Sequence, residues 1–506
     1  MLGLSLHYLW KRVNVTSSGG RFDSSIAVTA ARASAARPFL PVAFFGRNTL
    51  LGGQIAGSIT LLVVLVFTHV PALTAGMTPQ KGGNETAFPS SFASSDCSGQ
   101  TPAGYTRIFV AYRADGKSGT GTASDPFDGG SAQKFDALLR TRSESGMTNL
   151  VVCIGPGTFQ TEGVHDYAIG VGHLDKTLAS GFTVNRGWKV HGTAMHQTTL
   201  KLADLYLDTS TGTYLVGRII NTYDLDSYGV EISDLTLDDN YPALKLRYKK
   251  DLQLEAVCLR SNLGQHWIHN IHVVNAAGET TEAFPVEINS DANSPTESSG
   301  NIVEYVTMDH WASGKCTAIA IANAAAEVRF NRVIGHHIAY GGWQISDVYF
   351  HDNYAIDDVY GFNIDSLRNS DIVIRRNQII HPQSYGLVIG GVGQFVDFSI
   401  SGNTITLAGA YPWNTLYGVI FQGNVSGARV IGNRIVSDQS SSAARFFGLF
   451  EKGTHDTGNV FQGNQISSSF KYSLQGADCI HGNVDQSGTA LGGLSNTQRT
   501  ACLPGR

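Results

Sequence analysis

Histidine and aspartate residues recur in the middle of the chain at intervals of about 20 to 24 residues. His337, the adjacent pair Asp357 and Asp358, and then His381 follow one another in this way. Of two adjacent carboxyl groups, one tends to keep its proton, and a histidine nearby can exchange protons with it. We therefore expect His337, Asp357 and Asp358 to perform general acid–base catalysis. The same groups would also suit a calcium ion that holds an acidic sugar, or would serve only as solvated turn residues.

Alternation of apolar and polar residues predicts which side chains reach the outer surface. In the segment 360–365 the apolar residues alternate with Asn363 and Asp365, so these two side chains are expected to point outward. The same alternation predicts that the side chain of Glu287, in an earlier strand, also points outward. We also expect Asp365 to be a catalytic residue, together with His337, Asp357 and Asp358. The residues expected to bind the substrate are Glu287, Asn363, Trp311 and Arg368, with Trp311 stacking on a sugar ring or packing at a strand edge.

Two short patterns repeat in phase over the second half of the chain. One ends in asparagine at Asn353, Asn377, Asn403, Asn433 and Asn464. The other begins with an aromatic residue and glycine at Tyr360, Tyr385, Tyr417 and Phe447. Their spacing of about 24 to 32 residues, with strand-like alternation and without helix-length segments between copies, is typical of a solenoid of short strands. It predicts a parallel β-helix in which the asparagines occupy left-handed corner positions and bond along the stack.

The beginning of the repeat resembles a known superfamily. Residues 148–159, 187–192 and 198–202 resemble the first rungs of the right-handed parallel β-helices of the pectin-lyase-like superfamily. The resemblance extends from about residue 107 to 480. It implies an all-β, right-handed parallel β-helix with an N-terminal helix that covers the open end of the solenoid. The segment 131–139 has a helical apolar face, and Ser131 can cap its first turn.

The resemblance also implies an activity on carbohydrate. The segment 360–365 is similar to a motif of mannuronan epimerases, with Asn363 at the position of their catalytic aspartate. Asp357 and Asp358 are similar to the paired aspartates of polygalacturonases, although the other motifs of that family differ. We therefore expect a lyase, hydrolase or epimerase that acts on a polysaccharide along an outer groove. The alternative is a non-catalytic β-helix that binds glycans or a cell surface.

The N-terminal segment has the pattern expected of a targeting signal. Residues 50–67 are almost entirely apolar, and six basic residues against one acidic residue precede them. This pattern predicts a signal peptide or an uncleaved membrane anchor, with the N-terminus inside and the rest of the chain secreted or extracytoplasmic. The expected divisions are a basic segment 1–49, the signal or anchor 50–72, a flexible linker 73–104, the β-helix 105–482 and a tail 483–506.

The composition and the cysteine positions indicate which partners and which disulfide to expect. Charged residues make up 15% of the chain and the net charge is −5, which argues against nucleic acid as a partner. The partners we expect are a polysaccharide and, if the apolar segment is retained, a membrane. No organic cofactor is expected. All six cysteines follow the apolar segment, and Cys479 with Cys502 is the predicted disulfide; the alternative is that these cysteines are buried free thiols.

Overall fold

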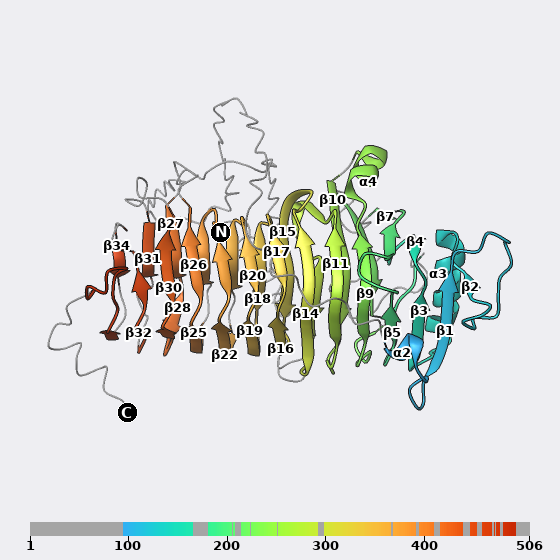
Figure 1. Cartoon of the computed structure of the whole chain (residues 1–506), viewed down its shortest axis with the longest axis horizontal. Helices are drawn as coiled ribbons and strands as arrows, with labels where there is room; N and C mark the ends of the chain where they lie inside the picture. Colours follow the sequence, from blue (N-terminus) through green and yellow to red (C-terminus); the bar gives the residue numbers. More distant parts are fainter. Residues whose placement is uncertain are drawn as a thin grey trace, which may run out of the picture. The chain divides into compact units, whose positions relative to one another are not determined.

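The computed structural model describes residues 95–164, 181–204, 206–207, 214–222, 224–249, 251–291, 298–365, 368–390, 394–408, 415–438, 446–452, 458–467, 470, 472–475 and 479–491. Within these residues almost all strands pair in parallel with the corresponding strands of the next rung. The exceptions are the antiparallel pairs β7–β8 and β10–β12. The predicted right-handed parallel β-helix is therefore confirmed, and Figure 1 shows its rungs in chain order from β1 to β34.

The strands form two sheets. The 12-stranded sheet contains β7 (Tyr206–Leu207), β8 (Tyr214–Asn221), β10 (Asp251–Arg260), β12 (Ala277–Ala283), β13 (Val286–Asn289), β15 (Ser313–Ala322), β18 (Ile338–Trp343), β21 (Tyr360–Asp365), β24 (Tyr385–Gly390), β27 (Leu416–Phe421), β31 (Phe446–Glu451) and β34 (Tyr472–Gln475). The 23-stranded sheet contains β1 (Thr106–Ala111), β2 (Phe127–Asp128), β3 (Leu150–Ile154), β4 (Gly157–Thr161), β5 (Lys189–His191), β6 (Thr198–Leu202), β9 (Glu231–Asp238), β11 (Trp267–Val274), β14 (Asn301–Asp309), β16 (Ala326–Arg329), β17 (Arg332–Ile334), β19 (Ser346–His351), β20 (Tyr354–Ile356), β22 (Arg368–Arg375), β23 (Gln378–Ile380), β25 (Gln394–Ser401), β26 (Thr404–Leu407), β28 (Asn424–Ser426), β29 (Arg429–Ile431), β30 (Arg434–Ser437), β32 (Val460–Gln462), β33 (Gln465–Ile466) and β35 (Cys479–His481).

A typical rung consists of three strands. The rung formed by β19, β20 and β21 pairs strand by strand with the rung formed by β22, β23 and β24. Each strand buries alternate side chains inside the coil, so Phe350, Ile374 and Ile400 stack above one another in successive rungs. Full burial of such a side chain stabilises the fold by roughly 1.5–3 kcal/mol. The repetition of this contribution holds the solenoid together.

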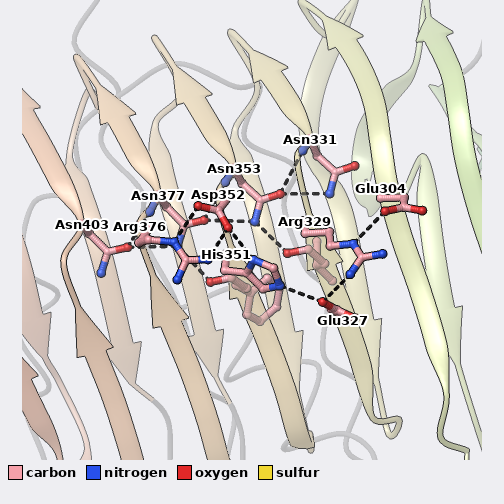
Figure 2. Close-up of polar contacts among 12 residues, drawn as sticks. Glu304, Glu327, Arg329, Asn331, His351, Asp352, Asn353, Arg376, Asn377 and Asn403 are labelled. Atoms are coloured by element: carbon pink, nitrogen blue, oxygen red, sulfur yellow. Dashed lines mark hydrogen bonds and ion pairs between the residues drawn. The ribbon is translucent and has the colours of Figure 1, made fainter. Parts of the chain in front are cut away.

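The asparagines of the first repeat form the predicted ladder inside the corner between two strands (Figure 2). Asn353 donates from Nδ2 to Oδ1 of Asn377 at 3.0 Å and to the carbonyl of Val328 at 2.8 Å. The backbone N–H of Asn353 also donates to Oδ1 of Asn377, at 2.9 Å. Both side chains are almost fully buried. Each asparagine thus satisfies backbone groups that the turn would otherwise leave unpaired.

The prediction that these asparagines have left-handed backbones was wrong. The left-handed residue is the one before each asparagine, as in Asp352 with φ of 58° and Arg376 with φ of 54°. In later rungs glycine takes that place, for example Gly402 with φ of 63°. The asparagine is required for its side-chain amide, whereas the residue before it turns the chain.

Three helices occur among the described residues, and all of them precede β10. Helix α3 (Ala132–Glu144) begins as predicted, and Oγ of Ser131 accepts a hydrogen bond from the N–H of Lys134 at 3.3 Å. Its residues Phe135 and Leu139 are fully buried in the core. Helix α4 (Tyr241–Tyr248) is inserted between β9 and β10.

The end of the predicted linker is attached to the β-helix. Helix α2 (Ser95–Ser98) contains Cys97, which forms a disulfide with Cys153 of β3. The sequence did not predict this pair, because residues 56 positions apart carry no local sign of contact. Cys258 and Cys316 are free and buried. Cys479 is disulfide-bonded, and its predicted partner Cys502 lies outside the described residues, so that pairing stays a prediction.

The predicted signal or anchor segment 50–72 also lies outside the described residues. Among the residues that the structure describes, no helix has the length and apolar character needed to cross a membrane. Export, membrane attachment and location of the protein stay predictions.

Candidate functional site

The outer surface of the 12-stranded sheet carries a group of polar side chains around β21. Phe362 and Ile364 are fully buried in the core, so Asn363 and Asp365 face outward as predicted. Asn363 pairs in register with Gly341 of β18 below and with Val388 of β24 above. A Cβ atom on Gly341 would lie 2.5 Å from Cγ2 of Thr317, so the side chain of Thr317 fills the space beside Gly341.

Tyr360 faces the same outer side because the strand is irregular at its start. Gly361 and Phe362 are both buried, and a Cβ atom on Gly361 would lie 2.7 Å from Cγ2 of Ile379 in the core. Tyr360 therefore points away from the core and stacks on Tyr385 of the next rung, with ring centroids 5.1 Å apart. Burial raises the pKa of Tyr360 to about 12, so its hydroxyl is protonated at neutral pH.

His337 lies beside Tyr360 in the turn that precedes β18. Its ring contacts the Tyr360 ring edge-on, with centroids 5.2 Å apart, and also lies 6.0 Å from the ring of Trp311. Nδ1 of His337 is buried and has no hydrogen-bond partner. Burial, with a smaller effect of the Lys315 charge, lowers the pKa of His337 to about 4. The imidazole is therefore neutral at pH 7, and burial also makes it a weaker base than a free histidine.

Three residues of this group were not predicted as site residues: Tyr360, which the sequence analysis described only as part of a repeat, and Lys315 and Glu282, which it did not mention. Lys315 of β15 is exposed, and its charge acts on both His337 and Glu282. Glu282 of β12 accepts a hydrogen bond from Oγ1 of Thr317, and burial raises its pKa. Because Ala283 is buried, alternation along the strand would have predicted that Glu282 points outward. The strand β12 contains no copy of the repeat, however, so nothing in the sequence singled out this residue. We call Glu282, Lys315, His337, Tyr360, Asn363 and Asp365 the outer site.

The two adjacent aspartates have different surroundings. The carboxylate of Asp357 is exposed and lies 3.5 Å from Nδ1 of His381, whose Nε2 is 3.0 Å from Asp438. Asp358 is only 1% exposed, and its Oδ1 accepts a hydrogen bond from the backbone N–H of His336 at 2.5 Å. Oδ2 of Asp358 is buried without a partner, and burial raises its pKa well above the usual value. The geometry fits a turn cap at Asp358 better than a proton donor to substrate.

The other predicted substrate-binding residues are distributed over several rungs. Glu287 occupies the predicted outward position of β13 but is 4% exposed, and it accepts hydrogen bonds from Sγ of Cys258 at 3.1 Å and from Asn289 at 2.9 Å. Burial raises its pKa. Trp311 packs partly against the core and against His337. The side chain of Arg368 lies outside the described residues.

A second polar surface covers the outer face of the 23-stranded sheet (Figure 2). Arg329 donates to Glu304 and to Glu327, both at 2.7 Å, and His351 bonds to Glu327 at 2.8 Å and to Asp352 at 2.7 Å. Asp352 in turn forms an ion pair with Arg376. We call these six residues, Glu304, Glu327, Arg329, His351, Asp352 and Arg376, the charge ladder.

Charges in the ladder neutralise one another. Hydrogen bonds and the charge of Arg376 lower the pKa of Asp352 to about 2. Arg329 and His351 lower the pKa of Glu327, against the opposing effect of burial. Such saturated pairs connect neighbouring rungs, but they keep little capacity to exchange protons. The outer site, with its neutral histidine and protonated tyrosine, is better suited to chemistry.

The comparisons with known proteins show similarity in fold only. No family model and no curated protein matches the sequence. The solved structures include the A-module of mannuronan C-5 epimerase AlgE6 from Azotobacter vinelandii, at 14% identity over 70% of this chain and 94% of that chain, with a TM-score of 0.34. A tailspike protein mutant of E. coli bacteriophage HK620 matches at 10% identity over 70% and 71%, with a TM-score of 0.41. The lacto-N-biosidase from Eubacterium ramulus matches at 11% identity over 75% and 67%, with a TM-score of 0.36.

Proposed function

We propose that this protein acts on a polysaccharide at the outer site, by abstracting a proton from a sugar carbon. The observation that carries the proposal is the contact between the neutral imidazole of His337 and the protonated phenol of Tyr360 on an outward sheet face. The two groups come from adjacent rungs, whose backbone hydrogen bonds hold their strands in fixed register. Rigid positioning of this kind is what proton transfer requires.

The roles follow from the protonation states. His337 would remove the proton from the carbon next to a uronate carboxylate, and the exposed ammonium of Lys315 would stabilise the charge that develops on that carboxylate. If Tyr360 then donates its proton to the departing glycosidic oxygen, the chain is cleaved, an unsaturated sugar forms, and His337 passes its proton to the Tyr360 phenolate. If instead a water molecule protonates the carbon from the opposite face, the sugar is epimerised and His337 returns its proton to that water, because the touching rings of His337 and Tyr360 leave no room for a sugar between them. Both outcomes balance with these groups and water.

Hydrolysis is less well supported. A glycoside hydrolase generally uses two carboxyl groups on opposite sides of the scissile bond. The predicted pair Asp357 and Asp358 does not provide them, because the carboxyl group of Asp358 is buried and bonded to the backbone of His336. We therefore propose a lyase or an epimerase, with Asn363 and Asp365 as substrate-positioning residues. Calcium has no role in this proposal.

The test is a screen of the purified protein on acidic and neutral polysaccharides. Cleavage is followed by the ultraviolet absorbance of unsaturated ends and by reducing sugar, and epimerisation by proton exchange with deuterated water. On the substrate that is found, His337→Gln and Tyr360→Phe should each lower turnover by roughly 10²–10⁴-fold. Tyr385→Phe is the matched control, because Tyr385 occupies the same position one rung above. Normal turnover in the first two variants would exclude the outer site.

A second candidate function rests on a different surface. Trp267 is 38% exposed and Tyr349 is 47% exposed, and both face outward beside the charge ladder. Backbone register places them in one column, three rungs apart. Exposed aromatic side chains at intervals along a rigid face suit the stacking of sugar rings. A non-catalytic glycan-binding protein would lose affinity for its glycan in the double variant Trp267→Ala with Tyr349→Ala, while His337→Gln would bind normally.

A further inference from the structure

Three potential metal ligands from separate elements meet near the N-terminal end of the β-helix. Asp96 belongs to α2, His191 to β5 and Glu231 to β9. Nε2 of His191 lies 3.8 Å from Oδ2 of Asp96 and 3.9 Å from Oε1 of Glu231. One oxygen of each carboxylate and one nitrogen of the imidazole all lie within 4.8 Å of one another. We call these three residues the α2 cluster.

The imidazole of His191 points an unused nitrogen into the cluster. His191 is fully buried, and its Nε2 has no hydrogen-bond partner. Nδ1 lies 2.7 Å from Oγ of Ser233, and that hydroxyl donates its only proton to Asp234 at 2.8 Å. Oγ of Ser233 must therefore accept a hydrogen bond from Nδ1–H of His191. The proton is on Nδ1, and Nε2 carries a free lone pair directed toward the two carboxylates.

This arrangement is the one that metal-binding histidines have in proteins. The ring nitrogen that does not bind the metal donates to an oxygen, and this hydrogen bond fixes both the tautomer and the ring orientation. In the α2 cluster Ser233 has this role, with Asp234 behind it.

The disulfide explains how Asp96 reaches the cluster. Cys153 of β3 is the register partner of His191, one rung below it. The bond from Cys153 to Cys97 thus holds α2 beside this part of the sheet, and Asp96 is the residue next to Cys97. The cluster is therefore formed only when α2 is attached to the β-helix.

Lys189 is the cation that balances the cluster. Its Nζ lies 2.7 Å from Oδ2 of Asp96 and 2.9 Å from Oε2 of Glu231. Nε2 of His269 lies 3.2 Å from Oε1 of Glu231. Lys189 and a metal ion would compete for the same two carboxylates. Removing the lysine charge should therefore strengthen metal binding.

We propose that Asp96, His191 and Glu231 form a binding site for a divalent transition metal ion such as Zn²⁺. One imidazole nitrogen with two carboxylate oxygens is a ligand set that Zn²⁺ accepts, with a fourth position left for water. Zinc bonds of about 2.0–2.1 Å in a tetrahedron place ligands roughly 3.3 Å apart. From their present positions the imidazole nitrogen and each carboxylate oxygen would approach by about 0.5–0.6 Å, and the two carboxylate oxygens, which lie within 4.8 Å of each other, by up to about 1.5 Å. The bound ion would fasten α2 across β5 and β9.

The experiment is metal titration of the untagged full-length chain by calorimetry, with Zn²⁺ as the probe and Co²⁺ for its visible spectrum. We expect about one Zn²⁺ per chain, and no comparable binding of Ca²⁺, which prefers six to eight oxygen ligands. Asp96→Asn and His191→Gln should abolish the binding. Ser233→Ala, which removes the hydrogen bond to the ligand, should weaken it by roughly 10–100-fold. Lys189→Met should tighten it.

His272→Gln is the matched control, because His272 also faces a carboxylate, Asp309 at 3.1 Å, but is in no group of three potential ligands within the part of the chain that the structure describes. Circular dichroism checks that each variant is folded. If His191→Gln does not fold, Asp96→Asn and Ser233→Ala carry the test. Absence of saturable Zn²⁺ binding in both the parent chain and Lys189→Met would overturn the proposal. So would binding that Asp96→Asn and Ser233→Ala leave unchanged.

Discussion

Asp358 gives the sharpest test of how the site is built. The replacement Asp358→Asn keeps an oxygen that can accept the hydrogen bond from the backbone N–H of His336. Asp358→Ala removes that acceptor and leaves a buried N–H unpaired, which costs about 1–3 kcal/mol. We therefore expect the alanine variant to lose about that much free energy of unfolding, and the asparagine variant to lose less than about 1 kcal/mol.

The pH dependence provides a second, independent measure. Burial raises the pKa of Asp358 above that of the unfolded chain, so the folded state holds a proton that the unfolded state releases. The resulting stabilisation is present below the unfolded pKa and is lost as pH rises through the folded pKa. Within that window it declines by about 1.4 kcal/mol per pH unit. Asp358→Asn has no such proton, and its stability should decline less steeply.

Denaturant unfolding at several pH values measures the loss of stability and its pH dependence. Turnover on the substrate found in the screen measures whether Asp358 takes part in catalysis. Asp358→Asn should keep turnover within a few-fold of the parent chain. A loss of roughly 10²-fold or more with an intact fold would show that Asp358 is a general acid or base after all. Equal stability of the alanine and asparagine variants would show that the hydrogen bond to His336 contributes little.

Three further predictions concern stability. Asn377→Ala removes the partner of the backbone N–H and side-chain amide of Asn353 and of the carbonyl of Phe350, and should lower the free energy of unfolding by about 3–5 kcal/mol in denaturant titrations, whereas exposed Gln378→Ala should change it little. Burial lowers the pKa of His266 to about 3, so stability should fall as pH drops from about 6.5 toward 3, and His266→Gln should reduce that slope by about 1.4 kcal/mol per pH unit. Cys97→Ser opens a loop of 56 residues and should cost about 4 kcal/mol, seen as a lower Tm; an unchanged Tm would contradict it.

The repeats by themselves determined the architecture. The repeated asparagine and the repeated tyrosine–glycine pair mark the same two positions in successive rungs, so their spacing gives the length of each rung. The repeat arises because each rung must bury one face of each strand and form hydrogen bonds with the next rung. The helix that starts after Ser131 was also readable, since its cap and apolar face are local features. Asn363 and Asp365 were placed on the outer face by alternation alone.

Contacts between residues far apart in the sequence were decided by the tertiary structure. Nothing local distinguishes Asp358 from Asp357, yet the left-handed turn at Asp357 exposes one carboxylate and buries the other. Lys315 approaches His337 because β15 and β18 pair in register. Cys97 reaches Cys153, and brings Asp96 to His191, only because α2 folds back on the first rungs. Strand pattern specifies which face a residue occupies, whereas register and chain reversal specify its neighbours.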